Sequence, residues 1–163
     1  MNYRITSEFQ TPYKVFTFID ELSEYKLQFT IRVKATYPAD HFSNSTIVKF
    51  SVPRTTTSVS FEYGKQSMGH RALFSEKDKK VEWDLKKFQG GKEFQLVAKL
   101  SLANATATTS RKEIGPVSIN FEIPMFSVSH LQVKFLKIAA AKGYNPYRWV
   151  RYVTHSNSFV CRT

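Results

Sequence analysis

Residues 145–153 read Asn-Pro-Tyr-Arg-Trp-Val-Arg-Tyr-Val and carry the side chains of this chain that are best suited to hold a ligand. A strand here would place Trp149 and Arg151 on one face, because side chains alternate along a β-strand. Arg148 and Val150 would then point to the other face. A planar guanidinium can stack on an aromatic ring and donate hydrogen bonds beside it. An extended peptide laid along such a strand would also gain backbone hydrogen bonds. Taken alone, however, a Trp on a strand usually belongs to the core or its rim, and a lone Arg is usually a solvated surface charge.

Enzyme chemistry finds no comparable support in the sequence. The histidines, at His41, His70, His130 and His155, are scattered without the spacing of metal ligands. The single cysteine, Cys161, lies close to the C-terminus, where a packed thiol is favoured over a nucleophile. No glycine-rich phosphate loop joins a strand to a helix, and no pair of carboxylates suggests acid–base catalysis. We therefore expect no catalytic activity, no metal and no cofactor.

The charge of the chain points to an anionic partner. The net charge is +11, from 24 Lys and Arg against 13 Asp and Glu. Residues 111–163 hold eight of the basic side chains and only two of the acidic ones, so the last third is the more basic part. The same third carries the Trp-Val-Arg stretch.

Two groups of basic side chains could face an anionic partner. The first lies in the middle of the chain and is interleaved with four carboxylates, so a solvated face is the favoured interpretation. Its members are Lys65, His70, Arg71, Lys77, Lys79, Lys80, Lys86 and Lys87. The second is less diluted by acids and could lie near an anionic membrane surface. Its members are Lys134, Lys137, Lys142 and Arg148.

Length and composition predict one folded domain. The chain has 163 residues, of which 42% are hydrophobic and 15% aromatic, enough for a substantial core. One cysteine allows no internal disulfide, which favours a reducing compartment. No apolar run approaches the ~20 residues of a membrane span, and the N-terminus lacks the apolar core of a signal peptide. We expect a cytosolic protein with only peripheral membrane contact.

The elements that position these side chains are predicted to be strands. Residues 26–35 alternate between apolar and polar side chains, which is typical of a half-buried antiparallel strand, and residues 117–123 repeat the pattern. Further strands are expected at 15–18, 46–52, 59–63, 72–74, 80–83, 94–102, 131–138, 148–154 and 158–162. Short strands joined by turns predict an all-β antiparallel sandwich. No segment has a helical period, and residues 103–110 are expected to form a mobile loop.

Several segments together resemble the mu homology domain, the cargo-reading domain of the medium subunits of clathrin-type adaptor complexes. They are the Trp-Val-Arg stretch, Gly115-Pro-Val-Ser-Ile-Asn-Phe-Glu-Ile-Pro124, Leu131-Gln-Val-Lys-Phe-Leu-Lys-Ile138 and Gly90-Gly-Lys-Glu93. Their order and spacing match along nearly all of the chain. Residues 144–154 and 1–6 look most similar to the medium subunit of the fourth adaptor complex.

The resemblance implies a binding site for tyrosine-based sorting signals, Tyr-x-x-Φ, with Φ a bulky apolar residue. Arg151 would stack on the tyrosine ring and donate to its hydroxyl, with Trp149 beside it. The hole for Φ would be lined by Val150 and the stem of Arg148, together with Val133 and Leu136. Strict alternation sends those last two side chains to opposite faces, so we expect a bulge or bend between them.

The resemblance also implies a domain organisation. Residues 1–163 would form part of a mu homology domain, with about 12–114 as the inserted second sandwich and about 115–163 as strands returning to the first. The first sandwich would then be incomplete at its N-terminal side. The family's tyrosine pocket also uses an aromatic and a carboxylate from its earliest strands, which this chain lacks, so we expect weak or absent signal binding by this polypeptide alone. A fragment, a truncated gene model and a shortened relative all fit.

Further partners follow from the resemblance. They are the large and small adaptor subunits, an Arf-family GTPase, and the cytosolic tails of cargo at the trans-Golgi network or endosomes. A second signal site is expected at Tyr13 and Lys34. Lipid headgroups are expected at Lys65, Arg71, Lys77, Lys79 and Lys80. The alternative is a basic β domain that binds nucleic acid or anionic phospholipid, but the aromatics fall mostly on core faces and no nucleic-acid motif is present.

Overall fold

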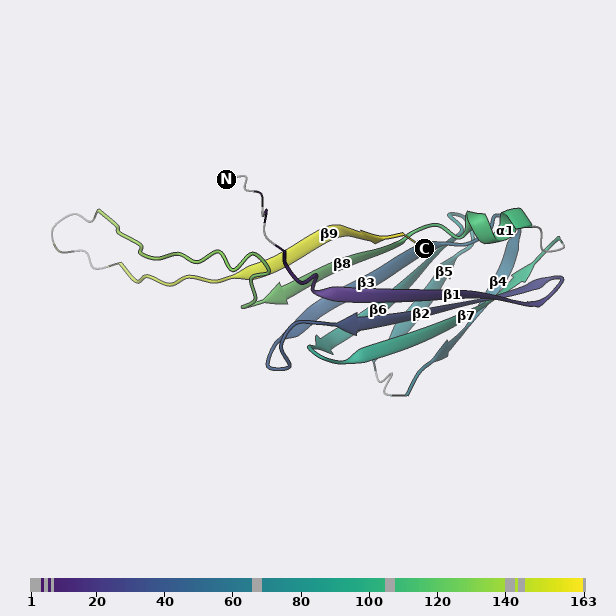
Figure 1. Cartoon of the computed structure of the whole chain (residues 1–163), viewed down its shortest axis with the longest axis horizontal. Helices are drawn as coiled ribbons and strands as arrows, with labels where there is room; N and C mark the ends of the chain where they lie inside the picture. The colour runs from purple at the N-terminus through teal and green to yellow at the C-terminus, as the bar shows by residue number, and fades with distance from the viewer. Residues whose placement is uncertain are drawn as a thin grey trace.

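Alternating apolar and polar side chains give the strands of this protein one buried face each, and two antiparallel sheets pack on those faces in a computed structural model. The structure describes residues 4, 6, 8–65, 69–104, 108–139, 143 and 146–162. One sheet has the strand order β1 (Tyr13–Ser23), β2 (Lys26–Ala35), β7 (Glu93–Leu102) and β4 (Thr56–Tyr63). The other has the order β5 (Arg71–Ser75), β6 (Lys80–Gln89), β3 (Phe42–Ser51), β8 (Val117–Pro124) and β9 (Val153–Cys161). The all-β sandwich expected from the sequence is confirmed (Figure 1).

The core lies between the sheets and is filled by the residues that the alternation selects. On β2 every second side chain from Leu27 to Ala35 is fully buried, and on β8 those from Val117 to Ile123 are buried as well. Burial of each large aliphatic or aromatic side chain contributes about 1.5–3 kcal/mol. Both predicted core faces are therefore confirmed.

A polar network crosses this apolar core. The hydroxyl of Tyr13 on β1 lies 2.9 Å from Oγ1 of Thr46 on β3, which in turn donates to Oγ of Ser43 at 2.9 Å. Tyr37 donates its hydroxyl proton to the carbonyl of Phe88 on β6. Buried polar groups are tolerated when they are hydrogen-bonded, so this network ties the two sheets together at little cost.

The strand predictions hold for the sandwich and are wrong near the C-terminus. Residues 131–139 and 146–152 have no regular secondary structure, and β9 runs without interruption from Val153. The expected strands at 131–138 and 148–154 are therefore absent, apart from the first residues of β9. These two irregular segments, called here the first arm (131–139) and the second arm (146–152), run out from one end of the sandwich (Figure 1).

One further expectation needs correction. A short helix, α1 (Thr108–Glu113), occupies part of the segment expected to be a loop, and six residues are too few to give a visible helical period. The domain boundary expected near residue 114 stays a prediction, and the strands on either side of it lie in the two sheets described above. β8 pairs with β3 from Ser45↔Glu122 to Lys49↔Ser118, so it completes the same sandwich. Among the described residues, no helix has the length and apolarity required to span a bilayer.

Candidate peptide-binding site

The two arms are fastened to each other where they leave the sandwich. After β8 the chain turns at Met125, whose φ of 57° lies in the left-handed region. Its N–H donates to the carbonyl of Tyr152 at 2.7 Å, and the N–H of Val133 donates to the hydroxyl of Tyr152 at 2.9 Å. Oγ1 of Thr154 donates to the carbonyl of Phe126 at 2.7 Å. These bonds hold the base of the first arm against the base of the second.

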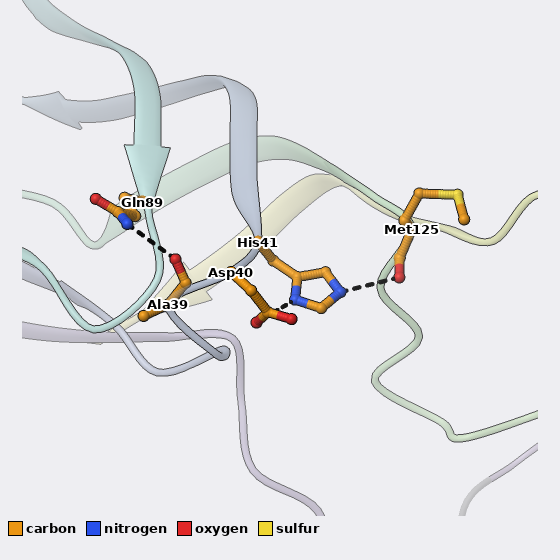
Figure 2. A network of polar contacts seen from close by, with 5 residues as sticks. All are labelled: Ala39, Asp40, His41, Gln89 and Met125. Carbon is orange, nitrogen blue, oxygen red and sulfur yellow. Dashed lines mark hydrogen bonds and ion pairs between the residues drawn. The ribbon is translucent and has the colours of Figure 1, made fainter.

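His41 links the same turn to the loop between β2 and β3. Figure 2 shows its ring between Asp40 and Met125: Nδ1 lies 2.8 Å from a carboxylate oxygen of Asp40, and Nε2 lies 3.2 Å from the carbonyl oxygen of Met125. Both partners are acceptors, so both bonds form only when each ring nitrogen carries a proton. The hydrogen bond from His41 lowers the pKa of the Asp40 carboxyl. In the same loop, the side-chain amide of Gln89 donates to the carbonyl of Ala39 at 2.9 Å.

A cavity of about 480 Å³ opens between the arms just beyond these bonds. It takes side chains from both arms, from the turn that precedes the first arm and from the start of β9. The lining residues are Ser127, Ser129, Leu131, Gln132, Val133, Val150, Arg151, Tyr152 and Val153. Its lining is largely apolar and includes one guanidinium and several hydroxyl groups, which suits a ligand that has an apolar and a polar part.

The structure brings together three of the six residues predicted for the signal site. Val133, Val150 and Arg151 line the cavity. The other predicted residues lie outside it, as exposed side chains of the arms. They are Arg148, Trp149 and Leu136.

The predicted division into two faces is wrong in this structure. Residues 146–152 form no strand, so no alternation separates Trp149 and Arg151 from their neighbours. Trp149 is 67% exposed, and Leu136 is 45% exposed. The bend expected between Val133 and Leu136 falls in an arm that is irregular throughout.

Arg151 remains available to a ligand. One guanidinium nitrogen lies 3.9 Å from a carboxylate oxygen of Glu122 on β8, and both side chains are about half exposed. Exposed ion pairs of this kind are worth at most about 1 kcal/mol, so this one would yield readily to a stronger contact.

Sequence reasoning missed Leu131 and Tyr152 as members of the site. Tyr152 is only partly exposed, and its hydroxyl accepts the N–H of Val133, so it positions the first arm. Its place directly after Arg151 was a usable signal. The Trp-Val-Arg motif indicates side chains that could contact a ligand, but it does not indicate the side chains that join the arms.

The second predicted site is corrected at one of its residues. Tyr13 is 1% exposed and belongs to the core network, so its ring presents nothing to a ligand. Every second side chain of a strand points to the same face, so Tyr13 lies on the inward face of β1 with Val15 and Ile19. This explains its burial. Lys34 is exposed, on the solvent-facing side of β2, as predicted.

The predicted lipid-binding residues do not all remain free. Lys79 donates to the carbonyl of Thr56 at 2.7 Å and is part-buried, so it has a structural role. The remaining four are exposed: Lys65, Arg71, Lys77 and Lys80. Lys142, of the second basic group, lies outside the described residues. In the part of the chain that the structure describes, no cluster of His, Cys, Asp and Glu could hold a metal ion.

The chain is similar to known proteins along its whole length. A model of the adaptor complexes medium subunit family matches residues 1–163. The sequence is 46% identical to the AP-4 complex subunit mu of Arabidopsis thaliana over 163 residues, which cover 99% of this chain and 36% of that protein. It is 32% identical to the AP-4 complex subunit mu of Dictyostelium discoideum (99% and 34%) and 33% identical to the AP-1 complex subunit mu-1-I of Caenorhabditis elegans (99% and 37%). The chain thus spans about a third of the length of these relatives.

Similarity to a solved structure also supports the fold. The mu homology domain of Fcho1 from Danio rerio, solved with a bound Eps15 peptide, superposes with a TM-score of 0.53. The match covers 90% of this chain and 43% of that one at 12% sequence identity, so it supports the fold alone. Together with the family match, it confirms the resemblance to mu homology domains.

Proposed function

Since the chain belongs to the adaptor complexes medium subunit family, we propose that it forms part of a medium subunit and binds sorting signals in the cytosolic tails of membrane cargo. Members of this family are non-enzymatic adaptors, so the chain is not an enzyme. The observation that carries the proposal is the cavity between the arms, where Val133, Val150 and Arg151 come together.

The side chains of the cavity suit the two halves of a Tyr-x-x-Φ signal. Val133 and Val150 offer an aliphatic wall against which the Φ side chain can pack. The half-exposed guanidinium of Arg151 can stack on the tyrosine ring and donate to its hydroxyl. Trp149 is open to solvent beside it and can cover the bound peptide. Leu136 and Arg148 would contact the peptide only if the arms take another arrangement around it.

The similarity to AP-4 mu subunits supports a placement within the family. We propose that the protein works with large and small adaptor subunits as a heterotetramer. An Arf-family GTPase would recruit the complex to the cytosolic face of trans-Golgi network or endosomal membranes. The exposed side chains of Arg71, Lys77 and Lys80 would add a peripheral contact with anionic lipid headgroups.

A peptide-binding experiment in the full-length protein tests the signal site. A fluorescent peptide with a Tyr-x-x-Leu core is titrated with the full-length protein, where a complete site is expected to bind near micromolar, about −8 kcal/mol. Arg151→Ala and Val150→Ser should each weaken binding by about tenfold, since each removes roughly 1.4 kcal/mol of contact. Lys112→Ala on α1 is the matched control and should bind normally.

A second peptide separates signal binding from charge attraction. Replacement of its tyrosine by alanine should abolish binding at every salt concentration. Nucleic-acid-like binding would instead be indifferent to that tyrosine and would fall steeply with salt. Unchanged affinity in both Arg151→Ala and Val150→Ser would remove the proposed site.

A further inference from the structure

β1 is the outermost strand of the four-stranded sheet, and one of its edges is unpaired within the described chain. The N–H of Thr36 donates to the carbonyl of Pro12 at 3.0 Å, immediately before β1 begins. Bonded pairs recur at every second residue of an antiparallel ladder. The even-numbered residues of 14–20 therefore turn their backbone groups toward β2, and the odd-numbered ones turn theirs outward.

Two of the outward carbonyls are already bonded, and the residues between them are not. Oγ1 of Thr11 donates to the carbonyl of Tyr13 at 3.0 Å, and a guanidinium nitrogen from α1 donates to the carbonyl of Ile19 at 2.7 Å. No described residue bonds to the outward groups of Val15 and Thr17. An unpaired stretch of this length on a sheet edge is a template for a short added strand.

Two aromatic rings flank this stretch on the solvent face. Phe16 is 43% exposed and Phe18 is 46% exposed, because their positions on β1 point away from the core. The guanidinium carbon of Arg32 lies 5.8 Å from the centre of the first ring and 5.1 Å from that of the second. The rings are therefore held in place on the surface with part of their apolar area open to a ligand.

Two lysines face each other at one end of the aromatic pair. Lys14 on β1 lies directly opposite Lys34 on β2, and both are exposed on the same face of the sheet. Neither makes an ion pair with another described residue. Glu93 lies opposite Lys34 on β7, but its carboxylate pairs with Arg32 at 3.8 Å, and Lys14 has no acidic residue opposite it. Like charges directly opposite each other destabilise a sheet, and a carboxylate from a ligand would relieve that repulsion.

From these features we propose that the free edge of β1 binds an extended, acidic segment of a partner protein. The segment would pair with the backbone of Val15 and Thr17 as an antiparallel strand. Its apolar side chains would lie beside Phe16 and Phe18, and a carboxylate two positions later would lie beside Lys14. This surface uses none of the residues of the cavity between the arms, so it stands independently of the function proposed above.

Fluorescence anisotropy with a labelled peptide tests the side-chain contacts. The probe is the sequence Ser-Leu-Thr-Phe-Thr-Glu-Ser, which places Leu and Phe beside the two rings and Glu beside the lysines. It should bind the 163-residue chain saturably. Lys14→Glu in the protein, or Glu→Gln in the peptide, should raise the Kd about tenfold. Lys86→Glu, an exposed lysine on the other sheet, should leave the Kd unchanged. Absence of saturable binding, or equal loss with Lys86→Glu, would overturn the proposal.

A proline substitution tests the backbone contacts. Thr17→Pro removes an outward N–H and no bond between β1 and β2, and edge strands accept proline at such positions. It should abolish peptide binding while the melting temperature is kept. If the variant does not fold, hydrogen exchange in the unaltered chain decides. The amides of Val15 and Thr17 should exchange more slowly when peptide is added, and unchanged rates would overturn the proposal.

Two outcomes would show that the peptide binds elsewhere or that another molecule occupies the edge of β1. Loss of binding in Val150→Ser would place the peptide in the cavity between the arms and overturn the β1 proposal. A concentration-dependent dimer in sedimentation experiments, removed by Thr17→Pro, would show that a second copy of this chain occupies the edge, which also overturns it.

Discussion

The hydroxyl of Tyr13 lies 2.9 Å from Oγ1 of Thr46, and this contact joins the first strand of one sheet to β3 of the other through the core. Thr46 is fully buried and donates its own hydrogen bond to Oγ of Ser43. Ser43 in turn donates to the carbonyl of Glu122 on β8 at 2.9 Å. The chain of hydroxyls therefore couples the packing of the two sheets to the strand from which the first arm departs.

Thr46→Val should destabilise the protein by about 1–3 kcal/mol, because the valine has nearly the same shape but leaves the hydroxyls of Tyr13 and Ser43 without their shared partner. Urea unfolding followed by circular dichroism measures the change. Thr30→Val, on the solvent side of β2, is the matched control and should change stability by less than about 0.5 kcal/mol. Equal effects of the two substitutions would show that the network contributes nothing specific.

The same network should make the fold sensitive to alkali. Burial raises the pKa of Tyr13 and that of Tyr37 above the usual value for tyrosine. The stability contributed by the protonated hydroxyls is thus complete below about pH 10 and is lost as the pH rises further, because the unfolded chain ionises first. Tyr13→Phe should reduce this alkaline loss in unfolding measurements between pH 9 and 11. An unchanged pH dependence would contradict the assignment.

A partly buried histidine should give a second pH dependence, on the acid side. The ring of His70 packs edge-on against Phe94 with 4.4 Å between ring centres, and its Nδ1 has no hydrogen-bond partner among the described residues. Burial lowers the pKa of His70, opposed in part by the charge of Asp84. A lowered pKa means that stability is complete above about pH 6.5 and falls as the pH drops toward the folded-state value.

His70→Phe should therefore flatten the stability profile between pH 7 and pH 5, as followed by thermal unfolding. The exposed His155 on β9 supplies the control, since His155→Gln should leave the pH dependence of stability the same as in the unaltered chain. A steep acid loss that persists in His70→Phe would assign it to another group.

Gly90 should tolerate no side chain. A Cβ at this position would lie 2.0 Å from the carbonyl oxygen of Pro38 and 2.4 Å from that of Tyr37, and both are backbone atoms that cannot swing away. Gly90→Ala should cost about 2–4 kcal/mol in urea unfolding or prevent folding altogether. Gly115→Ala is the control, because its Cβ would meet Ser51 at an ordinary 3.5 Å. A soluble, fully stable Gly90→Ala protein would show that the loop can shift.

The sandwich could be predicted from the sequence. The predicted strands are wrong only in the arms, where no neighbouring strand of the described chain is present to pair with them. On β2 and β8 the alternation is enforced by a core on one face, so period and burial agree. The Trp-Val-Arg stretch carries a similar alternation, but the second arm lies beyond the sheet and pairs with no strand in the described chain. Alternation predicts which face is apolar, whereas strand formation also requires a neighbouring backbone to receive its hydrogen bonds.

Only part of the candidate site could be predicted from the sequence. Val133, Val150 and Arg151 were expected together from the resemblance, and they line one cavity. The bonds that set their spacing involve Tyr152 and Met125, and they depend on a left-handed turn and on backbone groups far apart in sequence. Such contacts leave no periodic signal. The burial of Tyr13, in contrast, follows from its parity with Val15 and could have been read from the sequence.

His41 should control how firmly the first arm is held. Its two ring nitrogens contact acceptors on Asp40 and Met125, so the doubly protonated ring makes both bonds and the neutral ring can make only one (Figure 2). His41→Ala removes the link between the β2–β3 loop and the turn. The amides of Met125 and Val133 should then exchange with solvent several-fold faster, because the base of the arm opens more often.

The ring itself offers a direct readout of the same link. Nitrogen-15 spectra of the unaltered chain report which ring nitrogens of His41 carry a proton, and both should carry one while the bonds to Asp40 and Met125 are both made. His155→Ala, at an exposed position, should leave the exchange rates of Met125 and Val133 unchanged. If His41→Ala leaves the amides of Met125 and Val133 as protected as before, the bond from Met125 to Tyr152 alone is sufficient to hold the arm.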